Sequence, residues 1–303
     1  LYLLGNDSGQ LSTSTDATTW TPATTGLSSA LVDAHYGNGR YIVVGNGGAI
    51  ITSDTGSAWT IRTSGTTSNL SGVAYLNNVW VSVTNNAATI LTSSTNGDSW
   101  TTVSSPPVSG QQLNGAATDG TNHMVAVANN GGLILRSTDG NAWTAPASGT
   151  TTAMNDVTYA AGYYAVGNSG LLLNSSDGTS WAPIASAAGT NNLLWVGSLK
   201  GQLFAAGANG TLVSPGAGAT WAVVATGSTQ QLNGAAYGLV NGTTDTYVAV
   251  GNNGTVLTSP TGLASTWTAA TSGVTQALNE VAFGNDVFVA VGSGGTILSS
   301  ANG

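Results

Sequence analysis

Tryptophan recurs along this chain about every 40 residues, and this recurrence limits the available folds more than any other feature. Seven of the nine Trp residues are separated by 39, 41, 43, 38, 40 and 46 residues: Trp20, Trp59, Trp100, Trp143, Trp181, Trp221 and Trp267. A repeat of this length is typical of solenoids and propellers, in which each unit buries its apolar face against its neighbours. The chain is therefore predicted to be an array of similar supersecondary units.

A short polar motif precedes most of these Trp residues. Its consensus is S-x-D-G-x-x-W, and "STDGNAW" (137–143) is one complete copy. An Asp side chain can accept hydrogen bonds from the backbone amides that follow it, and Gly readily adopts a positive φ. The motif therefore predicts a tight hairpin turn, after which Trp begins a strand on the buried side. Its members are Ser14, Ser53, Ser94, Ser137 and Ser175; Asp16, Asn96, Asp139 and Asp177; Gly56, Gly97, Gly140, Gly178 and Gly218.

The rest of each unit has the composition of three further short strands. In one repeat these are 231–238, 246–251 and 255–259, followed by the strand that Trp267 begins. We name the four strands A, B, C and D in chain order. Gly- and Asn-rich segments such as "GNGG" (45–48) and "GNNG" (251–254) join B to C and predict hairpin turns. Four short strands in a period of about 40 residues indicate one blade of a β-propeller.

The hairpin motif resembles the Asp-box, or BNR repeat. The longer pattern around it, with "SGTT" and "VAVGNNGTVLTS" stretches, is similar to propellers of the photosystem II stability/assembly-factor-like group. The resemblance covers essentially the whole chain. It implies a β-propeller fold but leaves function open, because Asp-box propellers include hydrolases, assembly factors and binding modules.

Strand counting predicts the number of blades. Strand A begins seven times, near Leu31, Leu70, Leu113, Met154, Leu193, Leu232 and Leu278. Strand D also occurs seven times, whereas B and C occur eight times. We therefore expect one all-β domain over 1–303, a seven-bladed propeller of four-stranded antiparallel blades with one surplus B–C hairpin at a terminus. In this arrangement "SANG" (300–303) would supply the turn before the first D strand. Eight blades is the alternative, and it leaves one blade without its innermost strand.

Composition excludes several classes of function. Charged residues make up only 5% of the chain, and the formal net charge is −8 with four Lys and Arg. Nucleic acid is not an expected partner, because phosphate binding needs clustered cations. No Cys is present, which excludes disulfides and thiolate metal sites. No apolar run approaches the roughly 18 residues of a membrane span. The abundance of Thr and Asn predicts an extracellular or cell-surface protein, and five N-x-S/T triplets agree with export: Asn69, Asn174, Asn209, Asn241 and Asn253.

Catalytic and metal sites find little support in the sequence. The motif Asp residues occur once per blade around a circle, so we assign them to turns. A sialidase, suggested by the Asp-box, would need convergent Arg residues on a carboxylate, but Arg62 and Arg136 are predicted on different outer strands. No metal or cofactor is expected, because His35 and His123 lie in different strand types of different blades. Trp80 occupies a core column and is assigned to packing.

One column of strand A varies more than its neighbours. Its third residue is Asp33, Gly72, Gly115, Asp156, Trp195, Gly234 or Glu280 in successive blades. Since strand A is innermost in a propeller, we predict that Asp33, Asp156, Trp195 and Glu280 line the rim of the central channel, on blades one, four, five and seven. Gly would open space there, and Trp195 could stack on a sugar or another flat apolar group.

Three functions are compatible with such a rim. A non-catalytic binding or assembly module would recognise a glycan or another protein subunit. A structural subunit of a surface assembly would associate with itself through the unpaired hairpin. A glycoside hydrolase would need two carboxylates about 5–10 Å apart, and Asp33 with Glu280 is the pair that we would nominate. The rim could also be an idle, water-filled channel. We predict a binding module that is not an enzyme.

Overall fold

The computed structural model describes residues 1–85, 89–103, 111–217 and 220–303. Gly218, one of the expected turn glycines, therefore lies outside the described residues. Within them the regular secondary structure is almost entirely β-strand, which confirms the all-β prediction. The helical elements are four three-residue 3₁₀ turns in B–C connections: Asn46–Gly48, Asn168–Gly170, Ala208–Gly210 and Ser293–Gly295.

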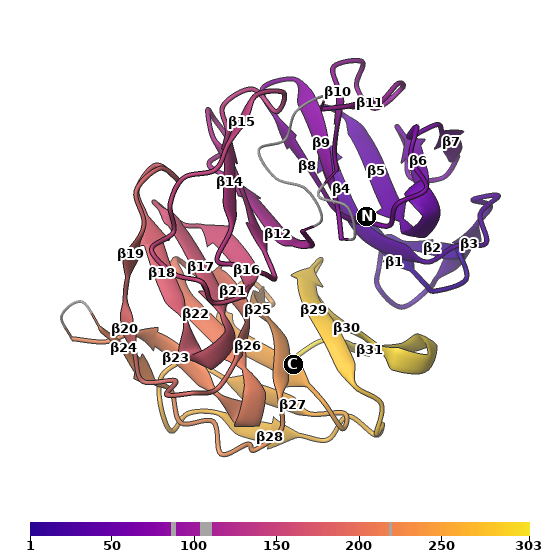
Figure 1. The fold of residues 1–303 in the computed structure, drawn as a ribbon. Helices are drawn as coiled ribbons and strands as arrows, with labels where there is room; N and C mark the ends of the chain where they lie inside the picture. The colour runs from indigo at the N-terminus through magenta and orange to yellow at the C-terminus, as the bar shows by residue number, and fades with distance from the viewer. Residues whose placement is uncertain (86–88, 104–110, 218–219) are drawn as a thin grey trace. The chain divides into compact units, whose positions relative to one another are not determined.

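The strands form eight sheets that follow one another along the chain (Figure 1). Neighbouring strands in the described residues pair antiparallel, and one short pair, β20 with β24, is parallel. The first four sheets contain β1 (Tyr2–Gly5), β2 (Leu11–Ser14) and β3 (Thr21–Ala23); β4 (Leu31–Gly37), β5 (Arg40–Gly45), β6 (Ile50–Ser53) and β7 (Thr60–Arg62); β8 (Leu70–Leu76), β9 (Val79–Thr84), β10 (Ile90–Ser93) and β11 (Thr101–Thr102); β12 (Leu113–Thr118), β13 (Met124–Ala128), β14 (Ile134–Ser137) and β15 (Trp143–Thr144).

The second four sheets continue the same A, B, C, D order. They contain β16 (Met154–Tyr159), β17 (Tyr163–Gly167), β18 (Leu172–Ser175) and β19 (Ala182–Pro183); β21 (Leu193–Leu199), β22 (Gln202–Gly207), β23 (Leu212–Pro215) and β24 (Thr220–Val223), with β20 (Ala185–Ser186) added at the edge; β25 (Leu232–Val240), β26 (Thr244–Gly251), β27 (Val256–Ser259) and β28 (Thr268–Ala270); β29 (Leu278–Gly284), β30 (Val287–Gly292) and β31 (Thr296–Ser300).

The eight sheets correct the main expectation of seven blades and match the eight-blade alternative. The first D strand, β3, pairs with its own β2 through Leu11 and Ala23 and is not donated to the last sheet. The reason is local, because the tight turn between Ser14 and Trp20 brings D directly back against C. The first sheet therefore lacks strand A and the last sheet lacks strand D. Two three-stranded sheets replace the expected surplus hairpin.

The chain divides into two compact units. Unit 1 comprises 1–15, 19–163 and 175–182, and unit 2 comprises 16–18, 164–174 and 183–303. Each unit is described by itself below. That the whole of 1–303 forms one domain remains a prediction.

Apolar side chains from neighbouring sheets form the core of each unit. In unit 1, one cluster joins Val81 of β9 to Met124 of β13 and Trp143 of β15. In unit 2, another joins Phe204 of β22 to Tyr247 of β26 and Trp267. The Trp that begins a D strand therefore fills the space between its own sheet and the preceding one.

Trp80 is also a core residue, as predicted. Its side chain is fully buried on β9 and belongs to the cluster between the second and third sheets.

The polar motif before each Trp forms a self-contained turn. The Ser137 hydroxyl accepts a hydrogen bond from the Gly140 amide at 2.8 Å, and Asp139 Oδ1 accepts the Asn141 and Ala142 amides at 2.8 Å each. The Trp143 indole then donates to the Gly140 carbonyl at 2.8 Å. Gly140 has a φ of 76°, which favours Gly. The side-chain oxygens of Ser137 and Asp139 are thus engaged within the turn, in agreement with a scaffold role.

Two copies of the turn differ in register from the sequence alignment. Ser93, rather than the predicted Ser94, accepts the Gly97 amide. Ser259 accepts the Gly262 amide in the repeat of Trp267, where the spacing from Gly to Trp is longer. One extra residue between Ser93 and Gly97, and two between Gly262 and Trp267, are enough to hide the motif from alignment on Trp.

Candidate functional site

The variable column of strand A follows a β-bulge. In six inner strands the register shifts between the first and third residues, so that the second residue is the extra one: Leu31/Asp33, Leu70/Gly72, Leu113/Gly115, Leu193/Trp195, Leu232/Gly234 and Leu278/Glu280. A bulge locally disrupts the hydrogen-bond ladder and re-aims the side chains around it. The residue at the third position of strand A therefore differs from the rest of the strand in the direction of its side chain and in its backbone hydrogen bonding.

Asp33 uses its carboxylate to join two neighbouring inner strands. Its Oδ1 accepts the Ala34 amide at 2.8 Å, and its Oδ2 accepts the Val73 amide of β8 at 2.9 Å. Burial raises the pKa of Asp33 above its usual value, although these two amides and His35 act in the opposite direction. The half-buried carboxylate thus has a structural role that the sequence argument did not assign to it.

A carboxylate beside a glycine recurs in this column. Asp156 Oδ1 accepts the Val157 amide at 2.8 Å and lies 3.0 Å from where a Cβ on Gly115 would be. Glu280 Oε1 accepts the Val281 amide at 3.0 Å and lies 2.6 Å from where a Cβ on Gly234 would be. Gly115 and Gly234 therefore leave room for an acidic side chain from the following inner strand.

The Asp33 carboxylate also faces a glycine of the column, Gly72, but here the acid is on the preceding inner strand and the contact is looser. A Cβ on Gly72 would lie 3.7 Å from Asp33 Oδ2, which is an ordinary contact. Gly72 is consequently not required by sterics, unlike Gly115, whose Cβ would also lie 3.2 Å from backbone atoms of Asp156 and Val157; at Gly234 the close contact is with the flexible end of Glu280 alone. Within unit 1 the column reads Asp33, Gly72, Gly115 and Asp156 along β4, β8, β12 and β16, and we call these four residues the unit 1 row.

Trp195 differs from the exposed platform that was expected. Its side chain is half-buried and packs against the cluster that contains Phe204 and Trp267. A Cβ on Gly197 would lie 2.5 Å from Trp195 Cζ2, so Gly197 is required for the ring to lie where it does. At least part of the indole is therefore used in packing rather than left for a ligand.

The four predicted rim residues occupy other sheets than those expected. Asp33 and Asp156 are in the second and fifth sheets and belong to unit 1, whereas Trp195 and Glu280 are in the sixth and eighth sheets and belong to unit 2. Asp33 and Glu280 are therefore not on the first and last blades of a seven-bladed ring. That all four face one opening remains a prediction.

Sequence reasoning missed the residue before this column. In three inner strands the side chain at this position donates a hydrogen bond to the main-chain carbonyl of the first residue of the following inner strand. These bonds join Ser71 to Leu113 at 2.9 Å, Asn114 to Met154 at 2.9 Å and Asn233 to Leu278 at 2.8 Å. The signal was visible as a recurrent Asn at 114, 155, 233 and 279. These bonds connect consecutive sheets and support the geometry of the neighbouring column.

The Arg side chains contact groups of the protein itself. Arg40 and Arg62 both contact Asp98 at 2.7 Å, and Arg40 also contacts Asp54. Two of the three Arg residues therefore lie close together, which the sequence did not suggest. Both form ion pairs with Asp side chains of this protein. Arg136 donates to the Asp177 carbonyl.

The two histidines do not form a metal site. The His35 ring lies edge-on to Trp80 with 5.8 Å between centroids, and burial lowers the pKa of His35 although Asp33 opposes the shift. His123 Nδ1 lies 2.8 Å from Asp119 Oδ2. No group of three His, Asp or Glu side chains arranged to hold a metal occurs among the residues that the structure describes.

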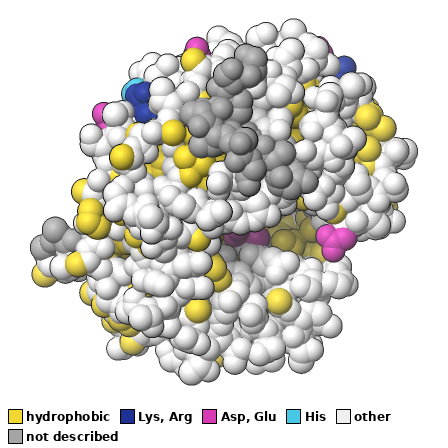
Figure 2. All heavy atoms as spheres, in the orientation of Figure 1, with side chains coloured by type: hydrophobic (Ala, Val, Ile, Leu, Met, Phe, Trp, Pro, Cys, Tyr) yellow, Lys and Arg dark blue, Asp and Glu magenta, His cyan; other side chains and the backbone are white. Residues whose placement is uncertain are grey.

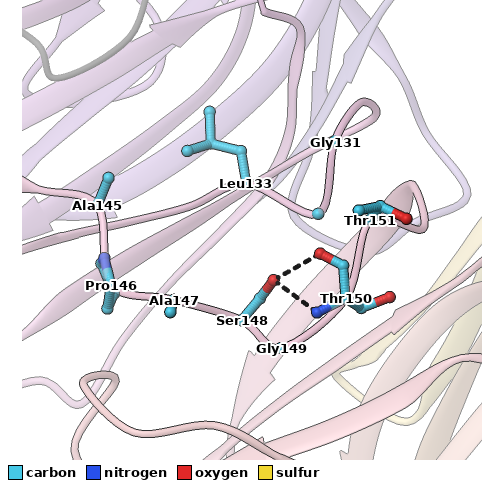
Figure 3. A pocket seen from close by; sticks show the side chains of 10 residues that line it. Gly131, Leu133, Ala145, Pro146, Ala147, Ser148, Gly149, Thr150 and Thr151 are labelled. Atoms are coloured by element: carbon cyan, nitrogen blue, oxygen red, sulfur yellow. Dashed lines mark hydrogen bonds between the residues drawn. The ribbon is translucent and has the colours of Figure 1, made fainter.

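A wide surface hollow recurs beside the B–C turns. The hollow in Figure 3 has a volume of about 680 Å³ and is lined by Gly131–Leu133 and Ala145–Thr151, where the Ser148 hydroxyl bonds the Thr150 amide and carbonyl. Equivalent hollows lie at Gly47–Ala49 with Ile61–Thr67, and at Asn209–Thr211 with Val223–Ser228. The lining of the hollow in Figure 3 has no titratable side chain. Its recurrence assigns it to the repeat architecture.

The visible surface carries few charges. In Figure 2 side chains that are neither apolar nor charged, together with backbone, cover most of the face shown, and Asp, Glu, Lys and Arg are scattered. Within the described part of the chain, no helix is long and apolar enough to cross a membrane.

The sequence matches no protein-family model and no curated protein. Similar solved structures do exist, and three illustrate their range. YCF48 from Cyanidioschyzon merolae is 17% identical, with a TM-score of 0.65 over 89% of this chain and 94% of that chain. A structure of YCF48 bound to D1 peptide is 19% identical, with a TM-score of 0.67 over 89% and 90%. Virginiamycin B lyase from Staphylococcus aureus is 9% identical, with a TM-score of 0.68 over 88% and 93%.

These similarities show a β-propeller fold. They include a protein seen with a peptide and a lyase, so the fold by itself does not decide between binding and catalysis. No family model supports the specific Asp-box assignment, and the resemblance to that repeat rests on the turn motif alone.

Proposed function

We propose that this protein is a non-catalytic binding module that recognises a cationic segment of a protein partner, and that it acts outside the cell or on its surface. We also assign its turns to the Asp-box type, on the Ser–Asp–Gly–Trp hydrogen bonding described above. The ligand proposal rests on the unit 1 row, and the location on composition.

The observation that carries the proposal is the order of residues in the unit 1 row. Two carboxylates, Asp33 and Asp156, lie on β4 and β16, and two residues without side chains, Gly72 and Gly115, lie on the intervening inner strands. Both carboxylates are half-buried, so solvent screens them less than fully exposed charges. A Lys or Arg side chain, or a peptide amino terminus, is the complementary ligand.

Two further observations support a protein partner. The chain has a net charge of −8, which favours association with cationic ligands over polyanions. YCF48, a propeller of similar fold, has been seen with a peptide bound. At 19% identity that similarity carries the fold alone, so the peptide is an analogy and the charge argument is the basis of the proposal.

A pair of substitutions that removes both charges tests the proposal. Peptides of varied Lys and Arg content are measured for binding to the native protein and to a double variant, Asp33→Asn with Asp156→Asn. Both charges are lost, and Asn keeps one acceptor oxygen, which is enough for the Val157 amide at position 156 but leaves one of the two amides at position 33 without its acceptor. Circular dichroism of the double variant therefore accompanies the binding measurement. We expect affinity for Lys- and Arg-containing peptides to fall at least tenfold, with a weaker dependence on salt.

Asp7→Asn is the matched control, because Asp7 is exposed in the same unit and outside the row. Its affinity for the same peptides should stay within about twofold of the native value, because solvent and salt largely screen an exposed charge. Equal losses in the control and in the double variant, or no peptide binding by the native protein at any salt concentration, would reject the proposal.

Two other ligand hypotheses have less support. Glycan stacking on Trp195 would have to use the part of the indole that is not packed against Gly197 and the core cluster. Hydrolysis by Asp33 and Glu280 would require those carboxylates to face one substrate. Glycan binding lost in Trp195→Ala, or release of reducing sugar lost in Glu280→Gln, would favour these hypotheses over peptide binding.

The two three-stranded sheets favour a second function, that of a structural subunit in a surface assembly. An unpaired strand edge is a template for pairing with another chain. Electron microscopy of the purified protein tests this function, since regular filaments or arrays would support it. Recovery of the native protein only from the cytosol would contradict the proposed location.

A further inference from the structure

Unit 2 has its own row of residues at the third position of strand A. The row consists of Trp195 on β21, Gly234 on β25 and Glu280 on β29, and we call these three residues the unit 2 row. The three strands are the inner strands of consecutive sheets, and β25 contacts both of the others. The unit 1 row has a carboxylate at each end, whereas the unit 2 row has an indole at one end and a carboxylate at the other.

Trp195 lies on the face of β21 that packs against the seventh sheet. Its side chain contacts the cluster between the sixth and seventh sheets, to which Leu232 and Ala235 of β25 belong. The benzene edge of the indole lies over Gly197, where a Cβ would be 2.5 Å from Cζ2 and 2.7 Å from Cη2. In the other six repeats the residue equivalent to Gly197 has a side chain: His35, Ala74, Ala117, Thr158, Ala236 and Ala282. Gly therefore accompanies the one Trp of the column and lets its ring lie along β21 on the side of β25.

Glu280 approaches β25 from the opposite side. The three heavy atoms nearest to where a Cβ on Gly234 would be all belong to the Glu280 carboxylate, with Oε1 at 2.6 Å, Cδ at 3.1 Å and Oε2 at 3.3 Å. Oε1 also accepts the Val281 amide at 3.0 Å, which supports this orientation. The indole and the carboxylate therefore converge on the strand whose own residue in the row has no side chain.

Part of the Trp195 indole is accessible. The side chain is only half-buried. Trp143 and Trp267 donate their indole N–H to a turn carbonyl. In the part of the chain that the structure describes, the Trp195 indole N–H has no such acceptor, and it is not a buried atom. A ring that is held on one side by the core and open on the other can stack with a ligand.

An indole and a carboxylate that converge on one strand suit a guanidinium group. A guanidinium is planar and cationic, stacks on aromatic faces, and pairs its N–H groups with a carboxylate in a fork. A Lys ammonium has the charge without the plane or the fork. A neutral sugar could stack on the ring but would gain nothing from the charge of Glu280. The net charge of −8 also favours a cationic ligand.

We propose that Trp195 and Glu280 form a binding site for the guanidinium group of an Arg residue in a partner polypeptide. The guanidinium would lie over β25 at Gly234, with its plane against the indole and its N–H groups directed at the Glu280 carboxylate. The site lies within unit 2, so it does not depend on the unit 1 row or on the proposed location of the protein.

Three tripeptides that differ in one side chain test this site without any change in the protein. They are acetyl-Gly-X-Gly-amide with Arg, Lys or citrulline at X, and citrulline keeps the planar shape of Arg but has no charge. Binding is followed by the NMR signals of the Gly234 amide and the Trp195 indole N–H, the latter assigned by its absence in Trp195→Phe. The Arg peptide should shift both signals in a saturable manner. The Lys and citrulline peptides should bind more weakly, by about fivefold or more, because each lacks the charge or the planar fork.

Variants of the protein then test the two side chains. Glu280→Gln and Trp195→Leu should each weaken binding of the Arg peptide by about fivefold or more, as measured at the Gly234 amide. Asp286→Asn is the matched control, because Asp286 is an exposed acid of the same sheet in the turn between β29 and β30. Its affinity for the Arg peptide should equal that of the native protein.

The peptide comparison holds even where Trp195→Leu fails to fold. Equal affinities for the Arg and Lys peptides, or for the Arg and citrulline peptides, would overturn the proposal, as would undiminished binding by Glu280→Gln. An Arg peptide that shifts the Val73 and Val157 amides beside the unit 1 row but leaves Gly234 unchanged would also overturn it, while supporting the proposed function. Shifts at Gly234 and Trp195 alone would support this site and not the unit 1 row.

Discussion

Replacement of Trp143 is the most direct test of how the repeat is held together. The Trp143 side chain is 7% exposed and packs between the third and fourth sheets, and its indole donates to the Gly140 carbonyl at 2.8 Å. Trp143→Ala removes the apolar contacts and leaves a cavity, which typically lowers the free energy of unfolding by about 3–5 kcal/mol. Trp143→Phe keeps much of the packing but leaves the carbonyl without its donor, so a loss of about 1–3 kcal/mol is expected.

Asp139 is the matched residue in the same turn. It is exposed, and its Oδ1 accepts the Asn141 and Ala142 amides at 2.8 Å. These hydrogen bonds resemble those of a helix N-cap, whose loss costs about 0.5–2 kcal/mol. Asp139→Ala should therefore destabilise the protein less than Trp143→Ala, and neither variant should change ligand binding while the protein stays folded.

Urea unfolding followed by circular dichroism measures both variants. The midpoint should fall in the order native, Asp139→Ala, Trp143→Ala, with a similar dependence on urea for all three proteins. A loss below about 1 kcal/mol for Trp143→Ala would show that the Trp is not a core element. A folded Asp139→Ala variant that loses a ligand would contradict the scaffold role of the turn.

Three further predictions concern turns and connections. Gly140→Ala should lower the melting temperature more than Gly120→Ala, because both have a φ of 76° but only at Gly140 would the new Cβ meet side chains, at 2.9–3.0 Å. Burial alone would raise the pKa of Asp119, but amides of His123 and its neighbours lower it strongly. The stability from that shift is therefore full above the unfolded pKa of about 3.9 and is lost as pH falls towards the lower folded pKa. Asp119→Asn should flatten the acid limb of a melting curve against pH. Asn233→Ala, which removes the bond to Leu278, should cost about 0.5–1.5 kcal/mol in urea unfolding, and the exposed Asn279→Ala much less.

The candidate site was only partly predictable from sequence. The variable column was found, because Asp33, Asp156, Trp195 and Glu280 interrupt an otherwise uniform strand. Its structural explanation was not found, because the Asp33 carboxylate binds an amide on the next inner strand and the Glu280 side chain lies over Gly234. Such contacts join residues about 40 positions apart, and no local pattern records them.

Periodicity in the sequence determined the type of fold and the order of strands in each unit. The spacing of Trp, the S-x-D-G-x-x-W turn and the Gly-rich B–C turns are local, and each acts through bonds within a few residues, as at Ser137, Gly140 and Trp143. They are readable without a structure for that reason. Comparison of repeats, in turn, assigned Trp80 correctly to the core, because it occupies a core column.

Only the tertiary structure decided to which sheets the strands at the two ends of the sequence belong. Seven A strands and seven D strands are compatible with seven closed blades or with eight sheets of which two are incomplete. The pairing of β3 with β2 selects eight, because a tight turn returns a strand to its nearest neighbour at less entropic cost than pairing with a distant strand.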